Sequence, residues 1–201
     1  MPPKARISRE MILEEAFQIA REEGADKITA RSISNRLHCS TQPVLYYFST
    51  VEDIKAAVYQ RADAYHSDWL MGKERDYGNP MLTIGMNYIR FAVEEGNLFR
   101  FLFQSNEFSG KSMLDLVRQD GLKPILQILG QEAGVTETEA GEIFATLFIF
   151  VHGYASILAN NAMLYEEKHL TASLMRVFSG AVYAVKEEGL LPSCEAEWEE
   201  K

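Results

Sequence analysis

The sequence predicts an all-α protein of about nine helices, in which a small N-terminal helix-turn-helix unit precedes a larger helical domain. Three observations predict this fold class. Apolar residues recur at helical spacing along most of the 201 residues. Serine and threonine residues that suit helix N-caps precede the first of these stretches, and glycine follows several of them. The sequence contains no alternating apolar and polar run bounded by tight-turn residues, so it gives no strand signal.

The first helix is expected over residues 9–23, with Ser8 as its N-cap and Gly24 as the glycine after its end. Ile7 and Ile12 have the spacing of a hydrophobic staple around this N-cap. The apolar residues of the helix fall on one stripe, formed by Ile12, Ala16, Ile19 and Ala20. This helix is long enough to support shorter helices that follow it.

Two short helices are expected next, over residues 30–37 and 41–47, with Thr29 and Ser40 as their N-caps. A three-residue turn would join them, and this order is the outline of a helix-turn-helix. A plain corner of a helical bundle is the alternative interpretation. A fourth helix is expected to begin at Ser49, with Glu52 closing its capping box.

The rest of the chain predicts a helical body. The fourth helix, residues 50–71, would link it to residues 1–50, and residues 51–190 would form it. Glycine, asparagine and proline mark the junctions between its helices. Further helices are expected near residues 81–95, 97–106, 112–133, 137–164 and 168–188, and residues 191–201 form an acidic tail.

The charge is unevenly distributed. The whole chain carries −9, whereas residues 1–50 carry +1 and the remainder −10. Contact with a polyanion is therefore expected at the N-terminal end. Cys39 and Cys194 form no C-x-x-C pair and the N-terminus has no apolar leader, so we expect a cytoplasmic location and no disulfide framework. The scattered histidines predict no metal site, and no cofactor is expected.

Residues 7–65 resemble the DNA-binding domain of the TetR family of transcriptional repressors. The resemblance lies in the ordered set Ile12, Ala16-Phe17, Gly24, Ile28-Thr29, Ile33, Ser40-Thr41-Gln42-Pro43-Val44, Tyr46-Tyr47-Phe48, Ser49 and Glu52-Asp53-Ile54. Residues 150–154 are similar to a segment in the penultimate helix of some members. The resemblance implies a homodimer that places one recognition helix per subunit in successive major grooves of double-stranded DNA. It also implies a small-molecule effector that binds the C-terminal domain and weakens DNA binding.

The sequence departs from the family pattern at phosphate-contacting positions. The family usually has tyrosine at the position of Leu45 and lysine at that of Val51, and no Lys or Arg lies between Leu37 and Ile54. Phosphate contacts are therefore expected from hydroxyls, helix N-termini and more distant basic residues. We expect a shallower salt dependence of affinity than in a lysine-rich relative. The candidates are Lys4, Arg6, Thr29, Arg31, Arg36, Ser40, Thr41, Tyr46 and Tyr47.

Base recognition is expected from Thr41, Gln42 and Tyr46, near the start of the third helix. Glutamine can pair with adenine through two hydrogen bonds, and the carbons of Thr41 and Pro43 can contact a thymine methyl group. Tyr47 is also expected to contact DNA. The alternative is that Tyr46 and Tyr47 pack against the supporting helices.

No charged residue occurs from Ile143 to Tyr165. The stretch is long enough to span a membrane, but polar residues interrupt it and Glu142 and Glu166 flank it, so a buried helix and no membrane contact are expected. A helix that is apolar nearly all round needs cover on several sides, which predicts a partner subunit. The predicted dimer interface consists of Val151, Ile157, Leu158, Leu174, Val177, Phe178, Ala181 and Val185.

Aromatic residues are dense between residues 86 and 103. They predict the lining of an apolar effector pocket, and ordinary core packing is the alternative. The predicted lining residues are Met86, Tyr88, Phe91, Phe99, Phe103, Phe148 and Tyr154.

The favoured hypothesis is a ligand-responsive, dimeric transcriptional repressor without enzymatic activity. A DNA-binding protein of the same fold without an inducer is one alternative, and a filled core would favour it. An all-α enzyme that uses the aromatic cavity is the other. Converging polar groups with perturbed pKa values would favour an enzyme, but the sequence contains no phosphate-binding loop, serine nucleophile elbow or H-E-x-x-H motif.

Overall fold

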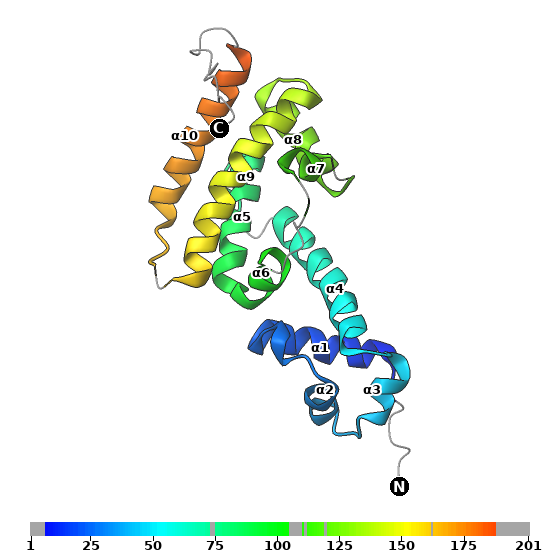
Figure 1. Cartoon of the computed structure of the whole chain (residues 1–201). Coiled ribbons are helices and arrows are strands. Elements are labelled where there is room, and N and C mark those ends of the chain that lie inside the picture. Colours follow the sequence, from blue (N-terminus) through cyan, green and yellow to red (C-terminus); the bar gives the residue numbers. More distant parts are fainter. Residues whose placement is uncertain are drawn as a thin grey trace, which may run out of the picture.

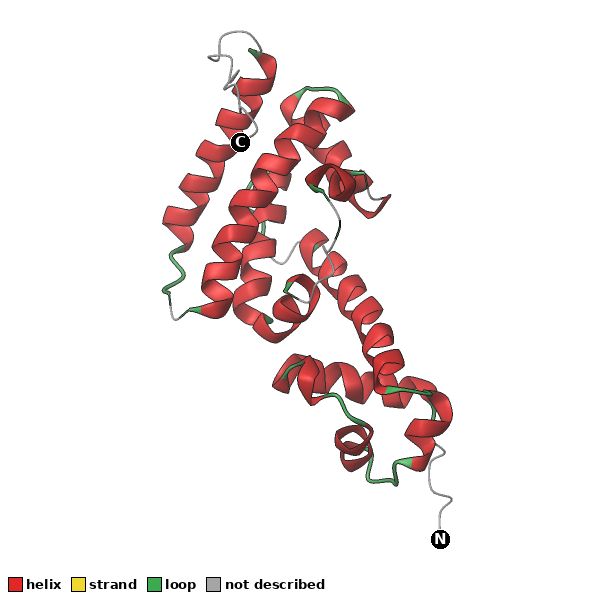
Figure 2. Cartoon of the chain, viewed as in Figure 1, coloured by secondary structure: helices red, strands yellow, loops and turns green. Residues whose placement is uncertain are grey.

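The computed structural model describes residues 7–72, 75–104, 110, 112–118, 120–161 and 163–187. Within these ranges the chain forms ten α-helices and two short 3-10 helices, with no strand, so the predicted all-α fold class is confirmed. A small group of N-terminal helices lies at one end of the molecule and a larger bundle at the other (Figure 1). Figure 2 shows helices and loops, and no strand, in the part of the chain that the structure describes.

The N-terminal group, which we call the head, consists of α1 (Arg9–Glu23), α2 (Ala30–Arg36) and α3 (Gln42–Tyr47), with a 3-10 turn at Ala25–Lys27. Ser8 caps α1 as predicted, because its Oγ accepts a hydrogen bond from the Met11 N–H at 3.2 Å. Gly24 ends α1 with φ +103°, a backbone conformation that residues with a Cβ rarely adopt. The core of the head is closed by side chains with 0–5% exposure, namely Ile12, Ala16, Phe17, Ile19, Ala20, Ile28, Ile33, Val44 and Phe48.

The third and fourth helices each begin one residue later than predicted. Thr29 caps α2 as expected, in a reciprocal capping box with Ser32. Ser40 does not cap α3; Thr41 occupies the N-cap position and makes no side-chain cap bond there. Pro43 lies in the first turn of α3, where its missing N–H costs no helical hydrogen bond.

The fourth helix, α4 (Val51–Met71), begins one residue later than predicted. The Thr50 Oγ1 accepts from the Asp53 N–H at 3.0 Å, and the Asp53 carboxylate accepts from the Thr50 N–H at 2.9 Å. The predicted box between Ser49 and Glu52 is therefore wrong. Each pair has a hydroxyl residue followed three positions later by an acidic residue, so the sequence pattern alone cannot show which pair forms the capping box.

The body of the molecule consists of α5 to α10. Its first helices are α5 (Pro80–Glu94), α6 (Gly96–Phe103) and α7 (Met113–Val117). They are followed by α8 (Lys123–Ala133), α9 (Glu137–Asn160) and α10 (Glu167–Lys186). Helix α9 packs against α5, α8 and α10 and lies at the centre of the bundle (Figure 1).

Three of the predicted body helices have different limits. The single helix expected over 112–133 is divided by a 3-10 turn at Asp120–Leu122, and Pro124 then lies in the first turn of α8. This division has a physical reason, because proline cannot continue a helix that precedes it. Helix α9 ends at Asn160 rather than 164, and α6 ends at Phe103 rather than 106.

By length and composition alone, α9 is long and apolar enough to cross a membrane. In the bundle its sides differ. Phe144, Leu147 and Val151 are buried against neighbouring helices, whereas Ile149 and Ile157 remain 63% and 47% exposed. Neighbouring helices cover one side of this apolar helix, and the described residues leave another side exposed.

The head is joined to the body by α4 and by an ion pair at the start of α6. Helix α4 packs on α1 of the head and on α5 of the body. Arg21 of α1 donates from Nε to the Glu95 carboxylate at 2.8 Å, and the Tyr65 hydroxyl donates to the same carboxylate at 3.1 Å. The Glu95 side chain is 5% exposed and that of Arg21 is 40% exposed, so this pair connects the two parts through a partly buried contact.

Candidate functional site

Helix α3 presents most of its side chains to solvent. Val44 is fully buried and Phe48, just after the helix, is 4% exposed, so these two residues anchor α3 to the head. Leu45, Tyr46 and Tyr47 are 56%, 81% and 36% exposed. A large aromatic side chain gains little from exposure to water, so this surface is suited to contact with another molecule.

The residues predicted to read bases lie at the start of the same exposed helix. Thr41 and Gln42 are exposed and Pro43 is half-buried, while Ser40 is exposed in the turn before them. The alternative in which Tyr46 packs against supporting helices is excluded by its exposure of 81%. Tyr47 instead meets the edge of the Tyr46 ring, with centroids 5.1 Å apart.

The basic residues of the head are largely engaged with groups of the head. Arg36, one of the phosphate candidates, donates to Glu22 and Glu23 at 2.7 and 2.5 Å, and is therefore held by acids on α1. Arg9 lies over the Phe48 ring at 4.7 Å.

Arg31 and Thr29 are exposed, although the Thr29 hydroxyl also takes part in the capping box of α2. The candidates Lys4 and Arg6 lie outside the described residues.

The body contains a cavity of about 350 Å³ between α4, α5, α7, α8 and α9. Its walls are mainly aliphatic and aromatic side chains, and its volume is that of a small-molecule pocket. The lining residues are Asp63, His66, Ser67, Leu70, Met71, Met81, Ile84, Gly85, Tyr88, Phe103, Leu116, Gly121, Leu122, Pro124, Ile125, Phe144, Leu147, Phe148, Val151 and Leu174.

Polar groups reach this cavity chiefly from α4. His66 is 7% exposed, and its Nε2 is buried without a hydrogen-bond partner among the described residues. Burial lowers the pKa of His66 to about 4, so its imidazole is neutral at pH 7. Partial burial also raises the pKa of Asp63. The Tyr88 hydroxyl lies 2.9 Å from Nδ1 of His152, so these two groups form a hydrogen bond with each other.

Three of the predicted pocket residues line the cavity, namely Tyr88, Phe103 and Phe148. Met86, Phe91 and Phe99 are 0% exposed and lie in the surrounding core, which corrects their predicted place in the lining. The Phe91 ring packs against His66 and Trp69 on the side of α4, with centroids 4.8 and 5.7 Å away.

The remaining pocket prediction, Tyr154, is also wrong as a lining residue. It is half-buried and its ring lies near that of Phe150, with centroids 6.5 Å apart. Tyr154 is therefore a neighbour of Phe150 on α9 and not a wall of the cavity.

The sequence analysis missed the polar residues that α4 contributes. A signal for His66 was present, because it continues a four-residue repeat of buried positions through Ile54, Val58 and Ala62. A histidine in such a stripe must be buried, and a buried imidazole either finds a partner or faces a space. The wall from α7 and α8 had no comparable signal, because the break between these helices was not predicted.

The predicted dimer interface divides into two sets. Val151, Leu158 and Leu174 are 6%, 9% and 3% exposed, so the chain itself already covers them and leaves little of their surface for a subunit contact. They pack against neighbouring helices of the same bundle, and Val151 and Leu174 line the cavity.

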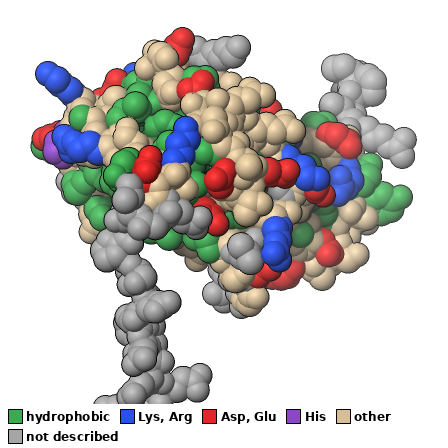
Figure 3. Space-filling view, turned by 90° about the horizontal axis from the view of Figure 1, so that it is seen from above, with side chains coloured by type: hydrophobic (Ala, Val, Ile, Leu, Met, Phe, Trp, Pro, Cys, Tyr) green, Lys and Arg blue, Asp and Glu red, His purple; other side chains and the backbone are tan. Residues whose placement is uncertain are grey.

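The other predicted interface residues remain accessible. Ile157 is 47% exposed on α9, and on α10 Val177, Phe178, Ala181 and Val185 are half-buried. Ile149 and Tyr183 add two exposed side chains, at 63% and 56%. Figure 3 views the molecule from the end of the body and shows hydrophobic side chains reaching the surface among scattered acidic and basic ones.

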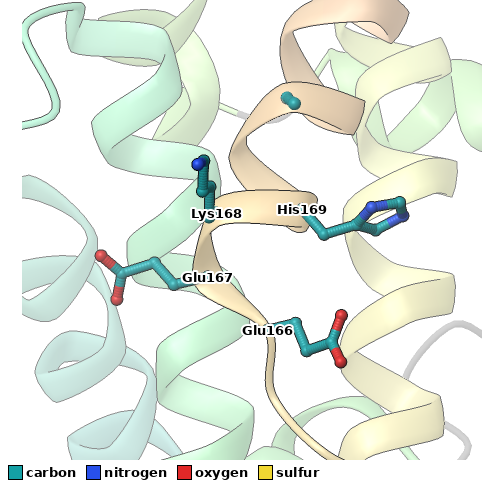
Figure 4. Close-up of a pocket in the computed structure, with 5 residues that line it drawn as sticks. Glu166, Glu167, Lys168 and His169 are labelled. Carbon is teal, nitrogen blue, oxygen red and sulfur yellow. The ribbon is translucent and has the colours of Figure 1, made fainter.

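A second hollow lies at the start of α10, where it is lined by Glu166, Glu167, Lys168, His169 and Ala172. Figure 4 shows Glu166 and His169 on one side of the chain and Glu167 on the other, so these groups do not converge. This hollow is open and comes from one short segment. Among the described residues, no group of three or more His, Cys, Asp or Glu side chains is placed to hold a metal ion.

The candidate binding surfaces among the described residues are the exposed side of α3, the cavity beside α4 and the accessible apolar side of α9 and α10. No protein-family model matches this chain, and no curated protein sequence matches it.

Proposed function

We propose that this chain is a TetR-like, homodimeric DNA-binding repressor that a small apolar or amphipathic ligand releases from duplex DNA. One observation carries the proposal. Helix α4 begins in the head, directly after the exposed α3, and its last two turns line the cavity. One helix therefore connects α3 to the cavity wall, and a ligand in the cavity can act on α3 through it.

The surface of α3 supports duplex DNA as the partner. Its exposed start offers the Thr41 hydroxyl, the Gln42 amide and the Pro43 ring, which are groups that can contact base edges. The exposed Tyr46 and Tyr47 add hydroxyls for phosphate contacts. Because Arg36 is engaged with two glutamates, binding would depend little on ionic phosphate contacts.

Two elements connect the cavity with the head. His66 and Leu70 of α4 line the cavity, while Ile54 and Val58 of the same helix are buried in the core near α1. Helix α6 has its last residue, Phe103, in the cavity wall and begins directly after Glu95, which binds Arg21 of α1. A ligand that moves either helix would tilt the head and misplace α3.

The same proposal assigns the uncovered side of α9 and α10 to a second copy of the chain. Ile149, Ile157 and Tyr183 are exposed apolar side chains on adjacent long helices. Two such pairs of helices related by a twofold axis would form a four-helix interface.

Of the alternatives, the cavity argues against a DNA-binding protein without an effector, because a filled core would be expected there. An enzyme would need a base that is positioned by a second group. His66 has no partner at Nε2 among the described residues, and a pKa of about 4 makes it a weak base at neutral pH. These features favour a binding site over a catalytic one.

The test is selection of duplexes from a random library with the full chain, followed by fluorescence anisotropy on the enriched sequence. We expect specific binding, and Gln42→Ala should lose about 1–3 kcal/mol of discrimination at one base pair. Gln60→Ala, at an exposed position of α4, is the matched control and should leave the base preference unchanged.

The salt dependence of binding to the same duplex gives a second measurement. A shallow slope of log affinity against log salt concentration is expected, because few cations among the described residues of the head are available for phosphates. If no sequence is enriched over the starting library, or if Gln42→Ala binds every selected sequence as the parent does, this proposal is wrong.

A further inference from the structure

One buried polar atom in the cavity lining has no hydrogen-bond partner among the described residues. His66 is more than nine-tenths buried, lines the cavity, and has no partner at Nε2 among the described residues. A buried polar atom without a partner costs free energy, so such an atom is unusual unless a bound molecule satisfies it. Its position indicates where a polar group of the ligand would lie.

Asp63 lies one turn before His66 on the same side of α4. Residues three apart on a helix have Cβ atoms about 5–6 Å from each other, so one small group can contact both side chains. Asp63 lines the cavity and is still reached by solvent, which places it at the rim. Ser67 lies beside them and also lines the cavity.

The charge of the lining restricts the ligand. Among the described residues that line the cavity, Asp63 is the one acidic side chain, and none is Lys or Arg. A carboxylate or phosphate ligand would meet a like charge and no cation. A positively charged group would instead be attracted to Asp63 and would give its carboxylate an ion-pair partner.

Aromatic rings near His66 add to this preference. The rings of Tyr88 and Phe103 lie 5.5 and 5.1 Å from the His66 ring, and both residues line the cavity. A cation within about 6 Å of such a ring is attracted by its π face. Phe144 and Phe148, which stack at 5.8 Å, supply an apolar wall further inside.

We propose that the effector is a cationic amphiphile, whose ammonium group donates hydrogen bonds to the Asp63 carboxylate and to Nε2 of His66 while its apolar body fills the cavity. This inference rests on the proposed function for the role of the cavity as effector site. A primary or secondary amine has enough N–H donors for both acceptors, whereas an alcohol has one.

Isothermal titration calorimetry on the full chain tests this with three matched probes: phenylbutylamine, phenylbutanol and phenylbutyrate. The amine should bind about tenfold more tightly than the alcohol, as one charge-assisted hydrogen bond predicts, and the acid should bind most weakly. Asp63→Asn should lower the affinity for the amine about tenfold and leave that for the alcohol unchanged.

Asp68→Asn is the matched control, because Asp68 is an exposed carboxylate on the same helix that does not line the cavity. It should leave all three affinities unchanged. His66→Phe should also weaken the amine selectively; Asp63→Asn, at the solvent-accessible rim, keeps the test valid if that core variant does not fold.

Equal or tighter binding of the alcohol or the acid, an unchanged amine affinity in Asp63→Asn, or no binding of the amine would each overturn the inference. Duplex binding measured on the same preparation separates the two proposals. A chain that binds specific DNA but ignores the amine contradicts only the ligand assignment. A chain that binds the amine through Asp63 but selects no duplex contradicts only the repressor assignment.

Discussion

The head and the body use apolar residues in opposite ways. In the head, Ile12, Ile33 and Val44 are completely buried, and the apolar side chains not needed for that core, such as Leu45, stand on the surface of α3. In the body, apolar side chains surround a cavity of about 350 Å³ and also cover the outside of α9 and α10. A short helix can thus be anchored by two residues, whereas long helices can enclose a cavity and still expose apolar side chains on another side.

A charge introduced on α9 tests whether the exposed apolar residues of the head and the body have different roles. Ile149→Asp, on α9, should convert the proposed dimer into a monomer, because a carboxylate would be buried without a partner in the subunit contact. Leu45→Asp is the matched control, since Leu45 is 56% and Ile149 63% exposed. Sedimentation velocity distinguishes the two, and a dimer that survives Ile149→Asp would show that the interface lies elsewhere.

The next effect compares a filled core with a cavity wall. Ile12→Ala should lower the free energy of unfolding by about 2–5 kcal/mol, because Ile12 is fully enclosed in the head. Ile84→Ala in the cavity wall should cost less, about 1–2 kcal/mol, because part of that side chain already faces a space. Urea unfolding monitored by circular dichroism measures both, and equal losses would mean that the cavity is closed in solution.

A smaller effect concerns the buried histidine of the body. The folded chain holds the pKa of His66 at about 4, below the ordinary value of 6.5, so the unfolded chain binds the proton more readily. The contribution of His66 to stability is therefore complete above pH 6.5 and is lost as the pH falls toward 4. Between about pH 7.5 and pH 5 this amounts to about 2 kcal/mol.

Replacing the histidine isolates that contribution. His66→Phe should lose less stability over this pH interval than the parent chain, whereas His169→Phe, at an exposed position of α10, should keep the parent's pH dependence. Urea unfolding at several pH values measures the difference. Parallel curves for the parent and His66→Phe would show that burial of this imidazole does not control the pH response.

An effect of similar size is expected at the contact between the two regions. Arg21→Ala leaves the buried Glu95 carboxylate with the Tyr65 hydroxyl alone, and should cost about 1–3 kcal/mol, less than in a fully buried pair because Arg21 is 40% exposed. Arg75→Ala removes an exposed ion pair with Glu167 within the body and should leave the free energy of unfolding unchanged within measurement error. Equal unfolding midpoints for the two variants would mean that the ion pair between Arg21 and Glu95 does not contribute to stability.

The sequence predicted the helical fold class and the exposed surface of α3 because both depend on local patterns. A four-residue apolar repeat identifies the buried stripe of a helix, and the residues outside that stripe are exposed. The same patterns misplaced helix starts by one residue at Ser40 and Ser49, where adjacent residues offer equivalent caps.

The cavity was predicted less well because its walls depend on where helices diverge. Periodicity shows that Phe91, Phe99 and Tyr88 lie inward, but only the packing of α5 against α4 and α9 determines that Tyr88 faces the space. For the same reason Val151 and Leu174 were assigned to a partner subunit, although helices of the same chain cover them. A buried position gives no information about which neighbour buries it.

Helix α4 has a mechanical consequence. Its 21 residues make a rod about 30 Å long, with His66 near one end and the head at the other. A tilt of about 5° at the cavity would displace the far end by nearly 3 Å, close to the spacing between successive base pairs. In the proposed complex with duplex DNA, a rearrangement of a few side chains around a bound ligand would therefore be magnified into a shift of register on the double helix.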